Sequence, residues 1–133
     1  MRVMIIGCGR VGSVLANRLD EAGHHVVVLD RDQQSFRRLS EKFSGERIVG
    51  NGLVEDYVRP TLQEKADILF AMTDKDNINL MIVQRVKRHF QLGRVIAVVH
   101  DSILAGLYKE LGVETVCPTD LVLKELLPMV QEG

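Results

Sequence analysis

The chain is poor in the residues that mark disulfide-stabilised, redox and metal-binding proteins. Only two of its 133 residues are cysteine, three are proline and none is tryptophan. Cys8 and Cys117 stand far apart and form no C-x-x-C pair, so we interpret them as small buried residues rather than as a metal or redox site. The histidines also lack the spacing of metal ligands: His24, His25, His89 and His100. We therefore predict that the protein holds no metal ion.

The chain also has no strong net charge and no long apolar run. Its 17 basic and 18 acidic residues give a net charge of −1, so no overall field would attract nucleic acid or an anionic membrane. Apolar runs are interrupted within a few residues, which predicts no transmembrane segment and no direct membrane insertion. Met1 leads almost at once into a predicted strand and leaves no room for a signal peptide. We expect a cytoplasmic protein whose residues 1–133 form a single domain.

The chain does have an apolar strand that runs straight into three glycines with the spacing G-x-G-x-x-G. Gly7 permits the tight turn from strand to helix, Gly9 lets a pyrophosphate approach the backbone, and Gly12 lets the helix pack against the strand. The segment from Val26 to Asp30 is a second apolar strand, and it ends in an acid at about the twenty-residue distance of the dinucleotide-binding fingerprint. The pattern predicts a nucleotide site, and the alternative is a tight turn that binds no ligand.

Short β-branched runs alternate with amphipathic segments along the whole chain, a pattern typical of βαβ units. Strands are predicted at residues 2–7, 25–29, 47–49, 67–72, 95–99 and 114–117. Helices are predicted at residues 10–22, 33–43, 54–63, 77–91, 102–111 and 119–131. Right-handed crossovers then give an α/β fold, a doubly wound (Rossmann) parallel sheet of six strands in the order 3-2-1-4-5-6, with ligands at the carboxyl ends where strands 1 and 4 meet.

Helical spacing also predicts which face of three helices is buried. For the first helix the predicted inward residues are Val11, Val14, Leu15 and Leu19. For the second they are Phe36, Leu39 and Phe43, behind a cap at Asp32. For the fifth they are Leu104, Leu107, Tyr108 and Leu111.

The residues at the ends of the strands are the candidate ligand contacts. Asp30 can accept hydrogen bonds from both hydroxyls of an adenine ribose and would repel a 2′-phosphate, which favours NAD, ATP or ADP over NADP. Arg31 could stack on adenine or pair with a phosphate, or it could be a solvated surface residue. Arg10 lies within the glycine turn, where its side chain can reach over bound phosphates. Cys8 and Val11 belong to the same turn and are included in the predicted contact set.

Two further segments belong to the same predicted edge of the sheet. Asn51 and Gly52 follow the third strand and could form a plain turn. Thr73 and Asn79 bound a polar segment after the fourth strand, which helix capping alone could explain. Because both segments lie on the edge that carries Asp30, we predict that these four residues take part in adenosine or phosphate binding.

These residues together resemble the nucleotide-binding N-terminal domains of potassium-transport regulators of the Trk/Ktr type, also called RCK domains. The resemblance covers essentially the whole chain. The matching stretches are Gly7–Gly12 with its arginine, Gly23–Asp30, Gly50–Asn51, Ala66–Asp67, Thr73, Asp76–Leu80, Val95–Ala97, Leu111–Val113 and Pro118. It implies a domain that is not an enzyme, that binds NAD(H), ATP, ADP or AMP, that pairs with copies of itself, and that relays ligand binding to a membrane channel or transporter for potassium. It also implies a place at the inner face of the membrane, through that partner.

The chain departs from the family pattern at three points. Gly50–Leu53 reads Gly-Asn-Gly-Leu where the family usually has Gly-Asp-Ala-Thr, so a carboxylate and a hydroxyl are missing and the preferred nucleotide is open. Val98 stands where the family usually has an arginine, which removes a charged contact. No second ligand-binding domain follows the last predicted helix in this sequence, which suggests a stand-alone form or part of a longer regulator.

The rival class is an NAD-dependent oxidoreductase or a fragment of one. Such an enzyme needs an acid or base near the nicotinamide and a substrate pocket, commonly on a second domain. The nearby ionisable residues read more simply as surface and helix-start residues: Asp74, Lys75, Asp76 and His100. A methyltransferase fits less well, because its glycine loop lacks the G-x-G-x-x-G register.

The last predicted helix, in the segment 119–133, is apolar over more of its circumference than packing on a sheet requires. Its apolar residues are Leu121, Val122, Leu123, Leu126, Leu127, Met129 and Val130. Pro128 is expected to kink or end it. Large exposed apolar patches usually mark interfaces, so we predict a homodimer or higher oligomer formed through this helix. The alternative is a helix that its own sheet buries completely.

Overall fold

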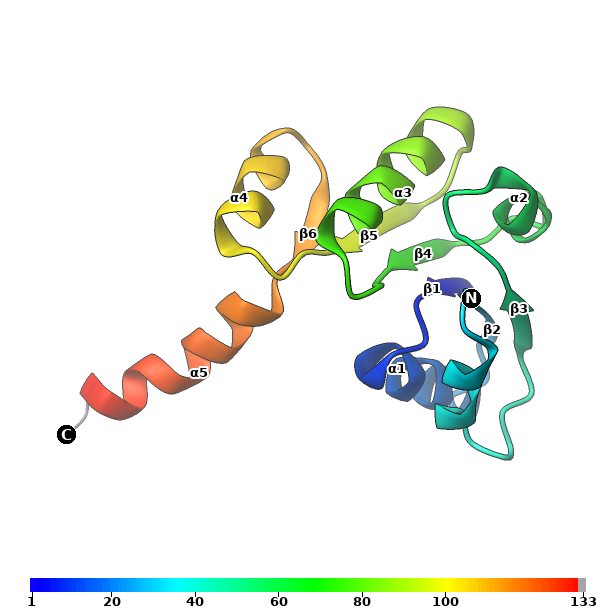
Figure 1. Ribbon diagram of the computed structural model, residues 1–133, viewed down its shortest axis with the longest axis horizontal. Helices are drawn as coiled ribbons and strands as arrows, with labels where there is room; N and C mark the ends of the chain where they lie inside the picture. The colour runs from blue at the N-terminus through cyan, green and yellow to red at the C-terminus, as the bar shows by residue number, and fades with distance from the viewer. Residues whose placement is uncertain (132–133) are drawn as a thin grey trace.

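The computed structural model describes residues 1–131 and contains a six-stranded parallel sheet. The strands are β1 (Arg2–Ile6), β2 (His25–Asp30), β3 (Glu46–Val49), β4 (Ile68–Ala71), β5 (Arg94–Val98) and β6 (Glu114–Val116). They stand in the order β3-β2-β1-β4-β5-β6, with every neighbouring pair parallel. The predicted doubly wound order is confirmed, and β1 and β4 meet where the direction of winding reverses (Figure 1).

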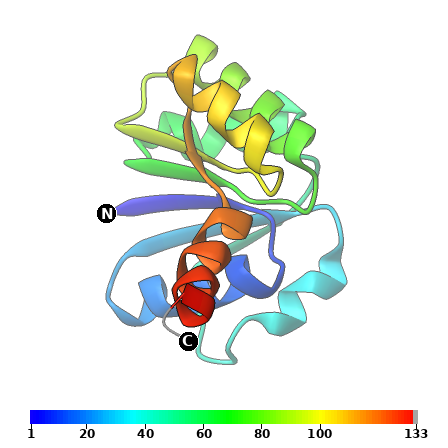
Figure 2. The same ribbon diagram turned by 90° about the vertical axis from the view of Figure 1, so that its left-hand side faces the viewer.

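Helices cover both faces of this sheet (Figures 1 and 2). α1 (Arg10–Glu21) and the 3₁₀ helix η1 (Gln33–Arg38) lie on one face, and α2 (Glu55–Gln63), α3 (Asp76–His89) and α4 (Ser102–Glu110) lie on the other. Alternate side chains of β1 enter two separate cores, with Val3 and Ile5 on the α1 side and Met4 and Ile6 on the α3 side. The central strands are apolar throughout because helices bury both of their faces.

The α-helix predicted over residues 33–43 is wrong, because the segment is the short 3₁₀ helix η1, which stops at Arg38. The helix ends there because the side chain of Asn17, on α1, forms hydrogen bonds with the backbone at the end of η1. The Ser40 amide donates to Asn17 Oδ1 at 2.9 Å, and Asn17 Nδ2 donates to the carbonyl of Arg38 at 3.4 Å. Leu39 and Phe43 are nevertheless buried, as predicted. All other helices and strands begin and end within two residues of their predicted bounds.

The buried face of α1 differs from the predicted one. Val11 and Val14 are exposed, while Gly12, Ser13 and Ala16 face the sheet. These small residues are needed because α1 lies so close to the strand: a Cβ on Gly12 would come within 2.1 Å of the carbonyl oxygen of Gly7. Larger side chains therefore turn outward. Leu15 and Leu19 pack at the edge of this core, as predicted.

The buried face of α4 is also only half as predicted. Leu104 and Tyr108 pack against the core around the buried Ala105, whereas Leu107 and Leu111 are exposed. This short helix carries two apolar stripes, because residues three or four positions apart lie on the same face of a helix. Either stripe could be the buried one on spacing alone. The stripe that contains the small Ala105 is the one that fits against β6.

The last helix, α5 (Pro118–Gln131), projects away from the rest of the domain (Figures 1 and 2). Every residue from Leu121 to Gln131 is exposed, so the alternative of a helix buried by its own sheet is wrong. Pro128 does not end the helix, which continues to Gln131. Residues 132 and 133 of the predicted terminal segment lie outside the described residues. Among the helices that the structure describes, none combines the length and hydropathy needed to cross a membrane.

Candidate functional site

A cavity of about 560 Å³ opens at the carboxyl ends of β1, β2 and β4, where the winding of the sheet reverses. Its wall is built from the glycine turn, the end of β2, η1, the turn after β3 and the segment between β4 and α3. Ligands of open parallel α/β sheets bind in the crevice at this reversal point. The cavity therefore occupies the position that the strand order predicts for a ligand.

The glycine turn forms one wall of the cavity, and glycine is present at each position for a different structural reason. Gly7 has a φ of +115°, and a Cβ there would lie 2.5 Å from the carbonyl oxygen of Met72. Gly9 lines the cavity, and a Cβ on it would meet no atom within 4 Å, so the space next to its backbone is open. In the described residues no side chain caps the start of α1 and no acid occupies its first turn. The N–H groups and positive end of the helix dipole can therefore meet an anion above Gly9.

Asp30 is held in a defined orientation at the end of β2. Its Oδ2 accepts the Cys8 amide and its Oδ1 accepts the Asp32 amide, each at 2.8 Å. A carboxylate oxygen has more than one acceptor direction, so each oxygen can accept a further hydrogen bond from the cavity side. This arrangement is suited to the paired hydroxyls of a ribose.

Asn79 of α3 stands behind the wall rather than in it, and it holds Thr73 in place. Its side chain is fully buried, with 0% exposure. Asn79 Oδ1 accepts the Thr73 amide at 2.9 Å and the Thr73 hydroxyl at 2.7 Å, and Asn79 Nδ2 donates to the carbonyls of Thr73 and Val98 at 3.0 and 2.8 Å. With these bonds made, Asn79 can influence a ligand only through Thr73, which does line the cavity.

The turn after β3 packs tightly beneath the cavity. Asn51 Oδ1 accepts the Leu53 amide at 2.9 Å, which closes the turn. A Cβ on Gly50 would come within 2.5 Å of the ring of Tyr57, and one on Gly52 within 2.7 Å of Ile6. Small residues at both positions therefore allow the turn to approach the sheet closely.

The structure brings together seven of the predicted contact residues in the cavity wall: Gly7, Gly9, Asp30, Arg31, Asn51, Gly52 and Thr73. The other five lie elsewhere. Cys8 and Asn79 are buried behind the wall, Gly12 packs on the glycine turn, and Arg10 and Val11 are exposed on the first turn of α1.

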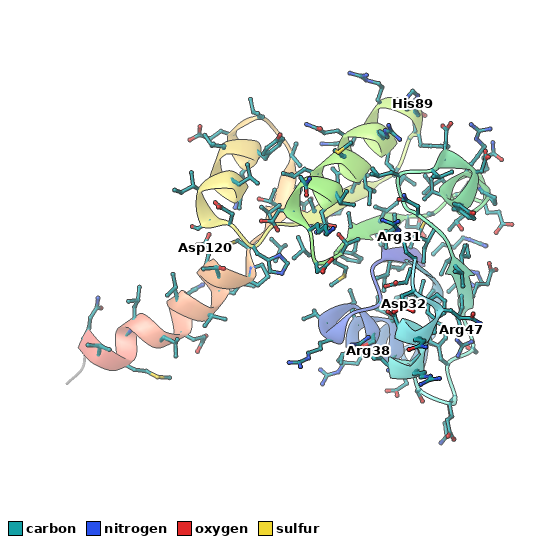
Figure 3. All side chains as sticks on the ribbon, in the orientation of Figure 1. Arg31, Asp32, Arg38, Arg47, His89 and Asp120 are labelled. Carbon is teal, nitrogen blue, oxygen red and sulfur yellow. The ribbon has the colours of Figure 1, made fainter. Side chains whose placement is uncertain are left out.

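Several residues that line the cavity are absent from the predicted contact set, among them Asp74 and Lys75, which the sequence pattern indicated only as surface and helix-start residues. Ser35 and Arg38 reach it from η1, and Asp74 and Lys75 from the segment before α3. Arg31, Arg38 and Lys75 form no ion pair among the described residues 1–131, so three cations face two carboxylates across the wall. Figure 3 shows Arg31 and Arg38 on the part of the molecule that carries the end of β2 and η1. This excess of positive charge suits a phosphate-containing ligand.

The thiol of Cys8 is unsuited to nucleophilic chemistry. Burial raises its pKa, and the charge of Asp30 raises it further, although Arg38 and Arg47 act in the opposite direction. The protonated thiol donates to the carbonyl of Ser35 at 3.4 Å. A thiol with a raised pKa is a poor nucleophile, so Cys8 has a packing role.

Asp76 and His100, two of the four ionisable residues weighed under the enzyme hypothesis, are engaged in local structure. Burial on its own would raise the pKa of Asp76, but hydrogen bonds from the amides of His100 and Asp101 and from the His100 ring outweigh it and lower that pKa. Asp76 Oδ1 lies 2.9 Å from His100 Nδ1. The pair sits outside the cavity wall and connects α3 to the segment before α4.

This fold and site define a class, that of open parallel α/β domains with a glycine turn at the reversal point of the sheet. Within that class the chain belongs to the TrkA-N domain family, whose pattern matches residues 3–119. It is 39% identical over 132 residues to the Trk system potassium uptake protein TrkA of Streptomyces coelicolor. That match covers 96% of this chain but 59% of the relative, so the chain spans less than two thirds of the relative's length.

Solved structures support the same fold. The TrkA-N domain of the inner membrane protein ybaL from Escherichia coli superposes with a TM-score of 0.82 at 21% identity, over 96% of this chain and 95% of the other. The Kef C-terminal domain of Shewanella denitrificans in its AMP-bound form gives a TM-score of 0.79 at 24% identity, over 98% and 80%. The fold also extends to an enzyme: the epimerase Mth375 of Methanothermobacter thermautotrophicus has a TM-score of 0.61 at 20% identity, over 73% of this chain and 34% of that one.

Proposed function

We propose that this chain is a regulatory domain that binds an adenine nucleotide in the cavity at the carboxyl ends of β1, β2 and β4 and controls a potassium channel or transporter. The observation that carries the proposal is the wall itself, in which the open position above Gly9, the oriented carboxylate of Asp30 and three unpaired cations face one another. Membership of the TrkA-N family and the AMP-bound Kef relative support the nucleotide and the potassium system.

NAD(H), ATP, ADP and AMP are the proposed ligands, with the adenine ribose on Asp30 and the phosphates above Gly9. A 2′-phosphate would meet the carboxylate of Asp30, so NADP is disfavoured. Arg31, Arg38 and Lys75 are the proposed cationic contacts, because charged donors make the strongest hydrogen bonds to phosphate. Arg10 is exposed on the first turn of α1, directly after Gly9, and although it does not line the cavity it is also proposed as a contact to the phosphates.

The chain is proposed to act as a homodimer or higher oligomer that is assembled through α5. The apolar side chains of this helix have no cover within the described chain, with Leu123 and Leu127 exposed by 43% and 54%. Apolar surface of this extent is a liability in a monomer and a typical interface in an assembly. The partner is proposed to be a membrane potassium transporter, which would place the chain at the cytoplasmic face of the membrane without inserting it.

A regulatory role without catalysis is proposed over an NAD-dependent oxidoreductase. Of the two carboxylates that the described residues bring to the cavity wall, that of Asp30 is held by backbone amides and that of Asp74 lies before α3 among free cations, while the thiol of Cys8 has a raised pKa. The likeness to an epimerase is one of fold and covers only part of that enzyme.

Thermal unfolding with a ligand panel tests the proposal. NAD, NADH, ATP, ADP, AMP and NADP are each added at millimolar concentration, and a ligand that binds only the folded state raises Tm by mass action. We expect at least one of the nucleotides without a 2′-phosphate to raise Tm more than NADP does. Unchanged Tm with the whole panel overturns the nucleotide site, and oxidation of NADH coupled to reduction of a small carbonyl substrate overturns the regulatory assignment.

A further inference from the structure

The first turn of α3 is joined to the segment between β5 and α4 by one side chain, that of Asp76. Asp76 directly follows Asp74 and Lys75, which line the cavity. Its Oδ1 accepts the His100 amide at 2.8 Å and its Oδ2 accepts the Asp101 amide at 2.9 Å. Both carboxylate oxygens are thus committed to the backbone of a neighbouring segment, so the two segments must move together while these bonds persist.

The same segment holds the first turn of α5. The carbonyl of His100 accepts the Thr119 hydroxyl at 2.7 Å and the Cys117 thiol at 3.5 Å, on either side of the residue that begins the helix. The Ser102 hydroxyl donates to Asp120 at 2.6 Å. Figure 3 shows Asp120 at the base of α5, below α4.

Beyond its first turn, α5 has no buried side chain among the residues the structure describes. The direction in which it leaves the domain is therefore set at its base, by the strand β6 that precedes it and by the bonds to His100 and Ser102. A small change in the position of His100 would be amplified along the length of the helix.

We propose that Asp76 is a positioning residue that couples occupation of the nucleotide cavity to the direction of α5. A ligand that contacts the segment from Thr73 to Lys75 alters the first turn of α3, and Asp76 transmits the change through His100 to Thr119. This inference rests on the proposed function, because it needs a ligand in the cavity and a second copy on α5. The coupling is reciprocal, so assembly through α5 must change ligand affinity by the same factor.

The alternative route, through Asn79, is less suited to transmission. Asn79 also links the rim to β5, through its bond to the carbonyl of Val98. Its side chain is fully buried among core residues, and close-packed interiors resist small displacements. Asp76 and Thr119 act at the surface, where segments can shift without repacking the core.

The experiment uses two variants at opposite ends of the route, Asp76→Asn and Thr119→Val. Asp67→Asn is the matched control for the first, since the Asp67 carboxylate accepts the Arg2 amide at 2.7 Å at the start of β4. Thr115→Val is the control for the second, because the Thr115 hydroxyl donates to the carbonyl of Ala105 at 3.2 Å, off the route. Sedimentation gives the dimer dissociation constant with and without saturating NAD or AMP, and calorimetry on dilute protein gives nucleotide affinity.

We expect nucleotide to change the wild-type dimer dissociation constant by about 5- to 150-fold, the usual range of coupling between two sites. Both route variants should bind nucleotide as the wild type does but lose most of this coupling, while both controls keep it. Hydrogen exchange should show that nucleotide alters protection of residues 99–102 and 118–121 in the wild type but not in Asp76→Asn.

The outcomes separate this inference from the function on which it rests. Wild-type coupling in Asp76→Asn and Thr119→Val overturns the inference and leaves the nucleotide site and the assembly intact. Binding and assembly that do not influence each other in the wild type also overturn it. A wild-type chain that binds no nucleotide, or remains monomeric, overturns the proposed function and the inference together. If Asp76→Asn does not fold, as judged by circular dichroism, Thr119→Val decides, since its hydroxyl is exposed and makes one bond.

Discussion

The side chain of Asn79 forms three hydrogen bonds with Thr73. Its Oδ1 accepts the hydroxyl of Thr73 at 2.7 Å and the amide at 2.9 Å, and its Nδ2 donates to the Thr73 carbonyl at 3.0 Å. A side-chain amide that satisfies both backbone groups of another residue fixes that residue firmly. The rim of the cavity after β4 is therefore held from behind by a residue that no ligand touches.

Replacement of Asn79 should destabilise the fold. In Asn79→Ala the part-buried carbonyl of Val98 and the part-buried Thr73 amide lose their partners, and an unsatisfied buried group costs roughly 1–3 kcal/mol. Urea unfolding should show a loss of about 2–4 kcal/mol in the free energy of unfolding. Asn77→Ala, on an exposed position of the same turn, is the control and should stay within about 0.5 kcal/mol of the wild type. Equal stability of the two variants would contradict the role given to Asn79.

Asp30→Asn should weaken nucleotide binding and leave the fold in place. A hydrogen bond to a charged group contributes roughly 1.5–3 kcal/mol, so affinity in calorimetry should fall at least tenfold. The amide retains an oxygen for one of the two backbone donors that Asp30 now serves. Asp32→Asn is the neighbouring control, since Asp32 caps η1 and lies outside the cavity wall. Equal affinity of Asp30→Asn and wild type would remove Asp30 from the ribose site.

Gly9→Ala should weaken nucleotide binding, whereas Gly12→Ala should lower the stability of the fold. The Cβ added at Gly9 points into open space, so Gly9→Ala should fold normally while its methyl group blocks the approach of a pyrophosphate. The Cβ added at Gly12 would lie 2.1 Å from the carbonyl of Gly7, so Gly12→Ala should lower Tm by several degrees. Thermal unfolding with and without NAD measures both effects. A Gly9→Ala variant that binds as tightly as wild type would contradict a phosphate above Gly9.

Leu123→Glu with Leu127→Glu should dissociate the assembly without unfolding the domain, because both side chains are exposed on α5. Light scattering at micromolar concentration should give a dimer or larger species for the wild type and a monomer for the double variant. Val54→Glu introduces one such charge at a similarly exposed apolar position, 41%, before α2 and should not change the mass. A monomeric wild type, or an unchanged oligomer in the double variant, would refute assembly through α5.

The lowered pKa of Asp76 should make part of the stability depend on pH. Because the folded-state pKa lies below the unfolded value, near 3.9 for aspartate, the carboxylate stabilises the fold above about pH 4, and this contribution disappears as the pH falls through the folded-state value. The stability difference between wild type and Asp76→Asn in urea unfolding should therefore be largest near neutral pH and shrink below pH 4 or so. A difference that stays constant with pH would show that the charge of Asp76 makes no contribution.

Much of the fold could be read from local patterns. The glycine spacing, the acid at the end of β2 and the alternation of apolar runs lie within short windows of sequence, and they suffice to predict the strand order and the position of the cavity. They suffice because a parallel sheet with right-handed crossovers leaves few topologies open, and because a turn such as that at Gly7 tolerates no other residue. The excess of apolar residues in α5 could also be predicted, because it depends only on the residues within that helix.

Only the tertiary structure decided which side of each helix is buried and which polar residues reach the ligand. Val11 and Leu107 satisfy a helical spacing as well as their buried neighbours do. The closeness of α1 to the glycine turn admits only small residues at that contact, and α4 packs through Leu104, Ala105 and Tyr108, which leaves Leu107 exposed. Asn17 ends η1 from another helix, Asn79 is withdrawn behind Thr73, and Arg38 is brought to the cavity from a segment predicted as ordinary helix. Each of these depends on a partner distant in the chain. A sequence determines which residues can be buried or bonded, whereas the choice among equivalent candidates is made by the neighbour that the fold places against them.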